Sequence, residues 1–283
     1  MRLAHLSDFH YTKLTINPLR LFPKRIFSHI HWLMHRADSF SCKPLEKLPD
    51  LFRLLNVDLV LLGGDFTSTS MPEEFKTAKD FVQTLEKPWI AIPGNHDHYT
   101  RRSYRNQMYY QHFANENSSF YSLQKDGIEC QKIAPRWWVI SLDTCLPTRI
   151  TSSQGVFSEE IESKLEGVLS LIPLDENVIL FNHYPFFDQE DKKRTLLRGR
   201  SLENLLQRHP KIRLYLHGHT HRHSIANLQP NGLPLVLDSG SCSQTKGGTW
   251  NLIDLKEEGC SVDSYQFDLE WKKKDTQEFV WKQ

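Results

Sequence analysis

The sequence of 283 residues lacks several features that mark large classes of protein. It has no run of about 18 apolar residues, so we expect no transmembrane helix. Asp8 and His10 interrupt the first apolar stretch, which argues against a secretory signal peptide. A basic excess is also missing, because 35 basic and 34 acidic side chains leave a formal net charge of +1. A histone-like protein needs such an excess, so we expect no stable nucleic-acid partner.

Cysteine is scarce as well. The chain has 5 cysteines, an odd number, and no CxxC pair. Free thiols in a reducing compartment explain this pattern better than a disulfide framework does. Repeats, low-complexity tracts and linkers are missing too, so we expect a single domain over 1–283. A hydrophobic fraction of 39% with 11% aromatic residues argues against a disordered chain.

Short apolar runs recur along the chain and predict strands that are buried on both faces. Amphipathic stretches at 72–86 and 158–172 predict helices between them, and Ser158 is placed to cap the second helix. The region 233–267 has no helix between its strands, so we expect antiparallel neighbours there. Together these elements predict an α/β fold of two sheets flanked by helices. The predicted strands lie at 3–8, 57–65, 88–97, 136–143, 177–183, 212–219 and 233–240.

Histidine is abundant, with 14 residues, and much of it lies in short motifs that end predicted strands. At the carboxyl ends of strands in α/β sheets, polar side chains leave the packed core together. A His-rich tract alone could lie on the surface by chance, but five such motifs in order at strand ends predict a metal centre. The motifs are SDFH (7–10), GGDF (63–66), GNHDHY (94–99), NHYPF (182–186) and HGHTH (217–221).

These motifs supply more candidate ligands than one metal ion takes, which is about four to six. Two divalent ions that share the carboxylate of Asp65 would use all of them. Carboxylates, imidazoles and an amide suit Mn²⁺ best, with Fe²⁺ or Zn²⁺ as other choices. The candidate ligands are Asp8, His10, Asp65, Asn95, His183, His217 and His219.

The combined motif set resembles that of the calcineurin-like metallophosphoesterases, from residue 3 to about residue 255. The resemblance implies a four-layer αββα sandwich with a dinuclear metal centre. It also implies that His96 faces the phosphate from outside the metal shell and stabilises charge or protonates the leaving group. Carried over by position, one ion takes Asp8, His10, Asp65 and His219, and the other takes Asp65, Asn95, His183 and His217.

One position departs from the family pattern. Many members carry an acidic or amide residue three positions after the aspartate of the GD motif, where it orients the histidine that corresponds to His96. Here that position is Ser68, which leaves the protonation state of His96 open.

A segment at 14–42 interrupts the regular order of strands and helices, and it is one of the features from which we predict the substrate. It belongs to a stretch with no acidic residue between Asp8 and Asp38, and its apolar side chains share one helical face. This amphipathic insert predicts either a helix packed on the core or an interfacial helix that binds an anionic lipid surface. The apolar face comprises Phe22, Ile26, Phe27, Ile30, Leu33 and Met34.

Two further basic segments lie towards the carboxyl end. Arg194, Arg198 and Arg200 lie in the segment 191–200, which predicts either a solvated loop or a site for a second phosphate. The tail at 268–283 combines tryptophans with lysines and predicts either a packed or a frayed terminus.

A lipid-facing entrance beside a basic pocket suits an amphiphilic pyrophosphate. The chain thus resembles the UDP-2,3-diacylglucosamine diphosphatases of bacterial lipid A synthesis. That resemblance implies a lipid-linked nucleotide diphosphate substrate, cleaved to UMP and 2,3-diacylglucosamine 1-phosphate, and a cytoplasmic enzyme peripheral on the inner membrane. The better-known branch has Arg at the position of His96, so this chain would belong to a more divergent branch.

Two other classes use the same fold. A soluble phosphodiesterase for cyclic nucleotides or nucleic acid, or a protein phosphatase, would keep the same metal centre without needing the apolar insert. A non-catalytic scaffold is disfavoured, because every expected ligand position and His96 are filled.

Overall fold

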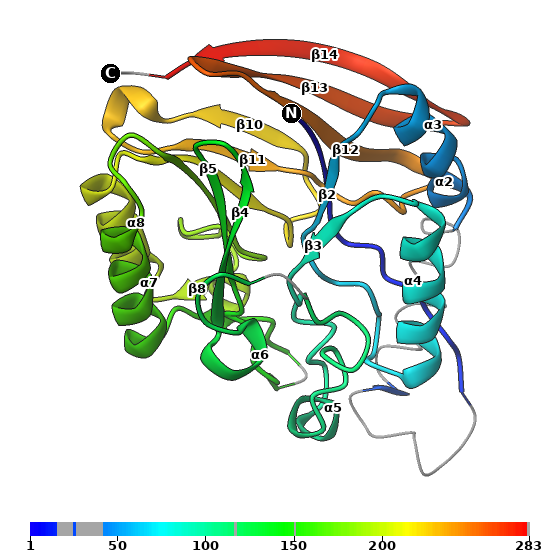
Figure 1. The fold of residues 1–283 in the computed structure, drawn as a ribbon. Helices are drawn as coiled ribbons and strands as arrows, with labels where there is room; N and C mark the ends of the chain where they lie inside the picture. The colour runs from blue at the N-terminus through cyan, green and yellow to red at the C-terminus, as the bar shows by residue number, and fades with distance from the viewer. Residues whose placement is uncertain (16–24, 27–41, 116–117, 150, 282–283) are drawn as a thin grey trace.

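The computed structural model describes residues 1–15, 25–26, 42–115, 118–149, 151–281, and these form two six-stranded sheets packed face to face (Figure 1). The first sheet has the order β14-β13-β12-β1-β2-β3 and the second has the order β10-β11-β9-β7-β5-β4. The strands of the first sheet are β1 (Arg2–Leu6), β2 (Leu59–Leu62), β3 (Trp89–Ala91), β12 (Lys246–Leu255), β13 (Gly259–Asp268) and β14 (Glu270–Val280). Those of the second are β4 (Ile128–Ala134), β5 (Trp137–Leu142), β7 (Asn177–Phe181), β9 (Ile212–His217), β10 (Ser224–Asn227) and β11 (Leu235–Asp238).

The central strands are buried on both faces, as their continuous apolar sequences predict. In β1, Leu3 belongs to the cluster between the two sheets, whereas Ala4 faces the outer layer. In β7, Ile179 faces the space between the sheets and Val178 faces the other way. Successive side chains of a strand point to opposite faces, so both sides of each sheet need an apolar cover.

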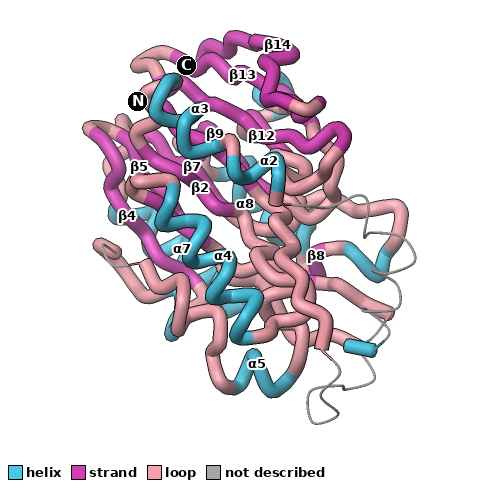
Figure 2. Tube along the Cα trace, turned by 90° about the vertical axis from the view of Figure 1, so that its right-hand side faces the viewer, coloured by secondary structure: helices cyan, strands magenta, loops and turns pink. Residues whose placement is uncertain are grey.

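Helices supply that cover, and four layers follow one another across Figure 1. Phe75 and Val82 of α4 pack on the first sheet, and Leu165 of α7 packs on the second. Figure 2 views the molecule from the side of α2, α3 and α4. The helices are α2 (Lys43–Glu46), α3 (Leu48–Leu54), α4 (Pro72–Thr84), α5 (Arg101–Arg105), α6 (Leu123–Asp126), α7 (Glu159–Leu171) and α8 (Gly199–Arg208), and a small sheet pairs β6 (Gly155–Val156) with β8 (Leu196–Leu197).

The layered α/β fold and both expected helices are confirmed. Ser158 caps α7 as predicted, because its Oγ accepts a hydrogen bond from the backbone N–H of Ile161 at 3.2 Å. The expectation of antiparallel neighbours over 233–267 is confirmed for β12 and β13, which pair with each other. β11 lies in the second sheet, where it is antiparallel to β10 and parallel to β9. The tail forms β14, antiparallel to β13, and ends on the buried side chain of Trp281.

Most of the amphipathic insert lies outside the described residues, including Phe22, Phe27, Ile30, Leu33 and Met34. Ile26 is described and is 41% exposed. Its neighbour Arg25 is buried, and its Nε donates to the carbonyl of Thr69 at 3.1 Å. Within the described part of the chain, no helix is long and apolar enough to span a bilayer.

Candidate metal centre

The loops that follow the parallel strands bring the five motifs together beneath the two sheets. Several ligand candidates there have positive φ angles, which is uncommon for residues other than glycine. The values are 60° for Asp8, 51° for His10, 53° for Asp65, 70° for His219 and 58° for His221. Strained backbone of this kind collects at functional sites, where the surrounding structure enforces it.

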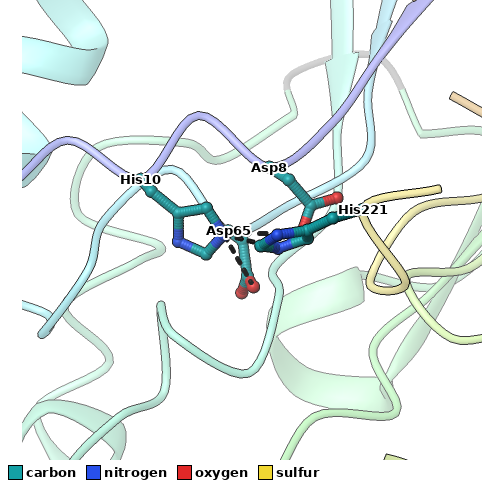
Figure 3. A group of neighbouring side chains, drawn as sticks. All are labelled: Asp8, His10, Asp65 and His221. Carbon is teal, nitrogen blue, oxygen red and sulfur yellow. Dashed lines mark hydrogen bonds and ion pairs between the residues drawn. The ribbon is translucent and has the colours of Figure 1, made fainter. Parts of the chain in front are cut away.

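Asp8, His10, Asp65 and His221 form a compact group whose donor atoms all lie within 4.8 Å of one another (Figure 3). Nε2 of His221 lies 2.8 Å from Nε2 of His10 and 3.0 Å from Oδ1 of Asp8. Nε2 of His10 lies 3.8 Å from Oδ2 of Asp65. Neighbouring ligands on one ion with bonds of about 2.1 Å are separated by about 3.0–3.4 Å. The group therefore has the size of a metal coordination shell.

A second group lies around the same Asp65 carboxylate. Nε2 of His183 lies 3.6 Å from Oδ2 of Asp65, and the rings of His183 and His219 meet edge to face at 5.2 Å. Nδ1 of His219 lies 3.0 Å from Oδ1 of Asn95. Asp65 thus stands between the two groups, as a bridging ligand must.

Backbone carbonyls fix the tautomers of the second group. Nδ1 of His183 lies 2.7 Å from the carbonyl of Gly63 and donates to it, which leaves the lone pair of Nε2 directed towards Asp65. Nε2 of His219 donates to the carbonyl of Arg194 at 2.9 Å, which frees Nδ1 as a ligand. Among the described residues, buried Nε2 of His183 has no hydrogen-bond partner, so the site fits a cation there.

The two histidines of the tract that reach the centre are each two residues later in the sequence than we expected. His221, rather than His219, joins Asp8 and His10, and His219, rather than His217, joins His183. His217 is still the last residue of β9, and its Nδ1 faces Oδ2 of Asp238 at 3.5 Å. The left-handed backbone at the two later histidines turns both side chains into the centre.

The loop between His217 and His219 approaches Ser7 and Asp8 so closely that position 218 must be glycine. A Cβ on Gly218 would lie 2.0 Å from Oγ of Ser7 and 2.5 Å from Oδ2 of Asp8. Such separations are far below van der Waals contact. The same carboxylate oxygen accepts the backbone N–H of His219 at 3.0 Å. Glycine thus lets the histidine loop approach Asp8 closely enough for both groups to form.

Opposite charges hold the carboxylates of the centre ionised. Burial alone would raise the pKa of Asp65, but the neighbouring His183 and His96 lower it below its usual value. Burial would also raise the pKa of Asp8, but His221, His10 and His183 together lower it well below its usual value. The Asp65 carboxylate outweighs the effect of burial and raises the pKa of His183 to about 9, so a cation bound at Nε2 would displace a proton there. The centre therefore presents two anionic groups at neutral pH, which is what divalent cations need.

His96 lies against this centre and is oriented by the main chain. Its Nδ1 lies 2.7 Å from the carbonyl oxygen of Ser68, and its ring meets that of His10 edge to face at 4.9 Å. Its backbone N–H donates to Oδ1 of Asp65 at 2.7 Å. The Ser68 hydroxyl instead donates to the His10 carbonyl at 3.0 Å. A carbonyl thus replaces the side-chain acceptor that the family pattern led us to expect.

The three arginines expected to bind substrate separate in the structure. Nη2 of Arg194 donates to the carbonyl of His219 at 3.0 Å, so this guanidinium lies at the metal centre. Arg198 is bound to Glu162 at 2.6 Å. Arg200 is bound to Glu203 at 2.8 Å on the surface of α8. The structure therefore does not bring Arg198 and Arg200 to the centre as expected, because nearby carboxylates hold both side chains.

Sequence reasoning missed Asp97, the last residue of the GNHD motif. Its buried carboxylate accepts backbone N–H groups from Phe66 at 3.2 Å, Thr67 at 3.0 Å and Gly94 at 2.9 Å. These bonds tie the loop after β2 to the loop after β3. Asp97 therefore holds the two loops that carry Asp65 and His96 in register, a role that its place in the motif could have suggested.

The family of the chain agrees with this geometry. Residues 1–223 match the family described as "Calcineurin-like phosphoesterase", so the chain belongs to this family. The family resemblance inferred from the motifs is confirmed. The protein is a metal-dependent hydrolase, and its Asp/His cluster together with the family indicates a centre for divalent metal ions.

Among curated proteins, the chain is 30% identical over 169 residues to the "Probable glycerophosphodiester phosphodiesterase GpdQ" of Arcobacter nitrofigilis, covering 58% of this chain and 57% of that protein. It is 24% identical over 198 residues to the "3',5'-cyclic adenosine monophosphate phosphodiesterase CpdA" of Escherichia coli, covering 67% of this chain and 62% of that protein. The matched part thus spans about three fifths of these two relatives.

Among solved structures, a "dimetal phosphatase from Danio rerio" superposes with a TM-score of 0.70 at 15% identity and covers 99% of both chains. A purple acid phosphatase from yellow lupin superposes with a TM-score of 0.59 at 11% identity, covering 99% of this chain and 53% of that one. At such low identity these likenesses show the shared fold alone.

Proposed function

We propose that the protein is a phosphodiesterase that hydrolyses small phosphodiesters, of the glycerophosphodiester or cyclic-nucleotide kind, with two divalent metal ions. The observation that carries the proposal is the position of Asp65 between two groups of potential ligands. The names of the relatives from Arcobacter and Escherichia support a diester rather than another phosphate ester.

The distances within the two groups support a separate set of ligands for each ion. Two such ions supply Lewis-acid activation of the phosphate and of an attacking water. The tautomers fixed by the carbonyls of Gly63 and Arg194 support the second ligand set. Asp8, His10, Asp65 and His221 would hold one ion, and Asp65, Asn95, His183 and His219 would hold the other.

The remaining residues of the centre act on the substrate. The Ser68 carbonyl accepts the Nδ1 hydrogen of His96, so the imidazolium form of His96 carries its second proton on Nε2, from which it would pass to the leaving oxygen or form a hydrogen bond to a phosphate oxygen. The exposed guanidinium of Arg194 supplies a positive charge beside His219 for a second polar group of the substrate.

This proposal replaces the expected hydrolysis of UDP-2,3-diacylglucosamine. The basic pocket assumed for that substrate loses Arg198 and Arg200 to ion pairs with glutamates. Most of the apolar face assumed for the lipid lies outside the described residues. The expected association with a lipid surface therefore stays an untested prediction.

A substrate panel tests the proposal. Purified protein with Mn²⁺ is incubated separately with a glycerophosphodiester, cyclic AMP and UDP-2,3-diacylglucosamine, and the products are identified by mass. We expect hydrolysis of at least one of the two diesters, with loss of that activity when a chelator removes the metal. Release of UMP from the nucleotide lipid with neither diester cleaved would contradict the proposal.

A further inference from the structure

We propose that Arg25 is a positioning residue for His96, acting through the loop whose Ser68 carbonyl orients the imidazole. This inference rests on the proposed phosphodiesterase function, in which His96 acts on the substrate. Arg25 comes from the amphipathic insert, yet its side chain is buried, at 7% exposure, against the loop after β2.

The acceptor for His96 makes this loop important. Because Nδ1 of His96 donates to a main-chain carbonyl, the direction of the ring depends on the backbone conformation at Ser68. Two residues further on, Ser70 has a φ of 54°, a backbone conformation that residues other than glycine rarely adopt. Oγ of Ser70 lies 2.8 Å from the carbonyl oxygens of both His96 and Asp97 and shares its one hydrogen between them. The loop is therefore bent tightly and is joined to His96 at two points.

Arg25 stabilises the bend from the carbonyl side. Its Nε donates to the carbonyl of Thr69 at 3.1 Å, and its Nη2 donates to the carbonyl of Ser70 at 3.1 Å. The planar fork of a guanidinium can reach two successive carbonyls with fixed geometry, whereas a lysine ammonium is a single point of charge. Charge-assisted bonds are also stronger than neutral ones.

Glu74 at the start of α4 holds the same loop from its amide side. Its buried carboxylate accepts backbone N–H groups from Thr69 at 3.0 Å, Met71 at 3.1 Å and Lys13 at 3.0 Å. The guanidinium thus binds the carbonyls of the loop while the carboxyl group of Glu74 binds its amides at Thr69 and Met71. The two side chains together fix the loop conformation, and with it the Ser68 carbonyl.

Kinetics with two leaving groups test the proposal. We compare the protein with its Arg25→Lys and Arg25→Gln variants, all with Mn²⁺, on a glycerophosphodiester and on bis(para-nitrophenyl) phosphate. An alkoxide leaving group needs a proton, whereas nitrophenolate does not. We expect kcat to fall about tenfold or more on the alkyl diester and by less than about threefold on the nitrophenyl diester.

Arg136→Lys is the matched control. Arg136 lies in the turn between β4 and β5, and its guanidinium also donates twice to one backbone carbonyl, that of Asp175, at 3.2 and 2.8 Å. We expect it to change kcat on either diester by less than about twofold. In a His96→Asn background, Arg25→Lys should cause no further selective loss on the alkyl diester. Equal losses on both diesters, or a full additional loss in that background, would overturn the positioning role.

A second measurement does not depend on turnover. We expect solvent exchange of the His96 Nδ1 proton, followed by nitrogen NMR of the imidazole, to be at least about tenfold faster in Arg25→Lys, because its carbonyl partner is no longer held. Unchanged exchange, or failure of both Arg25 variants to fold, would overturn the proposal. If the unaltered protein with Mn²⁺ cleaves neither diester, the proposed function fails, and this exchange still decides whether Arg25 positions His96.

Discussion

The loops below the parallel strands and the antiparallel ribbon of β12, β13 and β14 are built in opposite ways. The ribbon pairs over long strands with one register shift in each pairing, and its positive φ angles are confined to the tight turn at Leu269 and to Gly247. The loops collect positive φ angles at Asp8, Asp65 and His219, and they bury histidine nitrogens with no hydrogen-bond partner among the described residues. The ribbon adds stability, whereas the loops use some of it to hold a reactive centre.

The largest expected effect comes from removing the shared carboxylate of the loops. We expect Asp65→Ala to lower phosphodiester hydrolysis by about 10³-fold or more, because both ion sites lose a ligand. Activity is measured with Mn²⁺ on the preferred diester, and circular dichroism checks that the fold is intact. Full activity in a folded variant would rule out Asp65 as the bridge.

The two histidines of the tract give the next largest effect and sharpen the ligand assignment. We expect His221→Ala to weaken Mn²⁺ binding by about 10–100-fold or more and His217→Ala to change it by less than about threefold. Calorimetric titration with Mn²⁺ gives both affinities. If His217→Ala has the larger effect, the ligand set expected from sequence is correct and the one drawn from geometry is wrong.

A variant of the ribbon end should show the reverse pattern. Trp281 is buried and packs against Trp137 at a ring distance of 5.8 Å, so Trp281→Ala leaves a cavity. We expect it to lower the free energy of unfolding by about 3 kcal/mol while leaving kcat of the folded protein unchanged. Urea unfolding and kinetics on the same sample provide the test. A large loss of kcat at unchanged stability would break the division between ribbon and loops.

The smallest effects concern the arginines of the basic segment. We expect Arg194→Ala to raise KM for the diester by about fivefold, because its guanidinium lies beside His219. Arg200→Ala should leave KM within about twofold, since Arg200 pairs with Glu203 on the exposed surface of α8. Steady-state kinetics compare the two. Equal increases in KM for the two variants would mean that Arg200 also contacts the substrate.

Periodicity and motif position predicted the fold and most of the centre. The central strands could be found because Leu61 and Val60, like other neighbours there, are both apolar and face opposite clusters. β14 could not be found in the same way, because three successive lysines follow Trp271 and hide its alternation. The motif that ends each parallel strand was enough to place Asp8 and Asp65 at one edge.

Other features depend on backbone torsions or on distant partners. His217, His219 and His221 are evenly spaced by two, so the spacing is the same whichever pair turns inward, and only the left-handed turns decide. Arg198 pairs with Glu162, which lies 36 positions away in the sequence. The Ser68 carbonyl that orients His96 is a backbone atom, and no side-chain pattern can reveal it.

The outer edge of β14 has a consequence for how molecules of this protein meet in solution. Within the described part of the chain, β14 is the last strand of its sheet, and its outer edge is open for 11 residues. An open edge is a template on which a strand of another molecule can add, which leads to aggregation. In a symmetric antiparallel pairing of two β14 strands centred on Lys273, the exposed lysines at 272–274 would lie opposite one another. The longest regular edge of the fold is thereby protected by electrostatic repulsion.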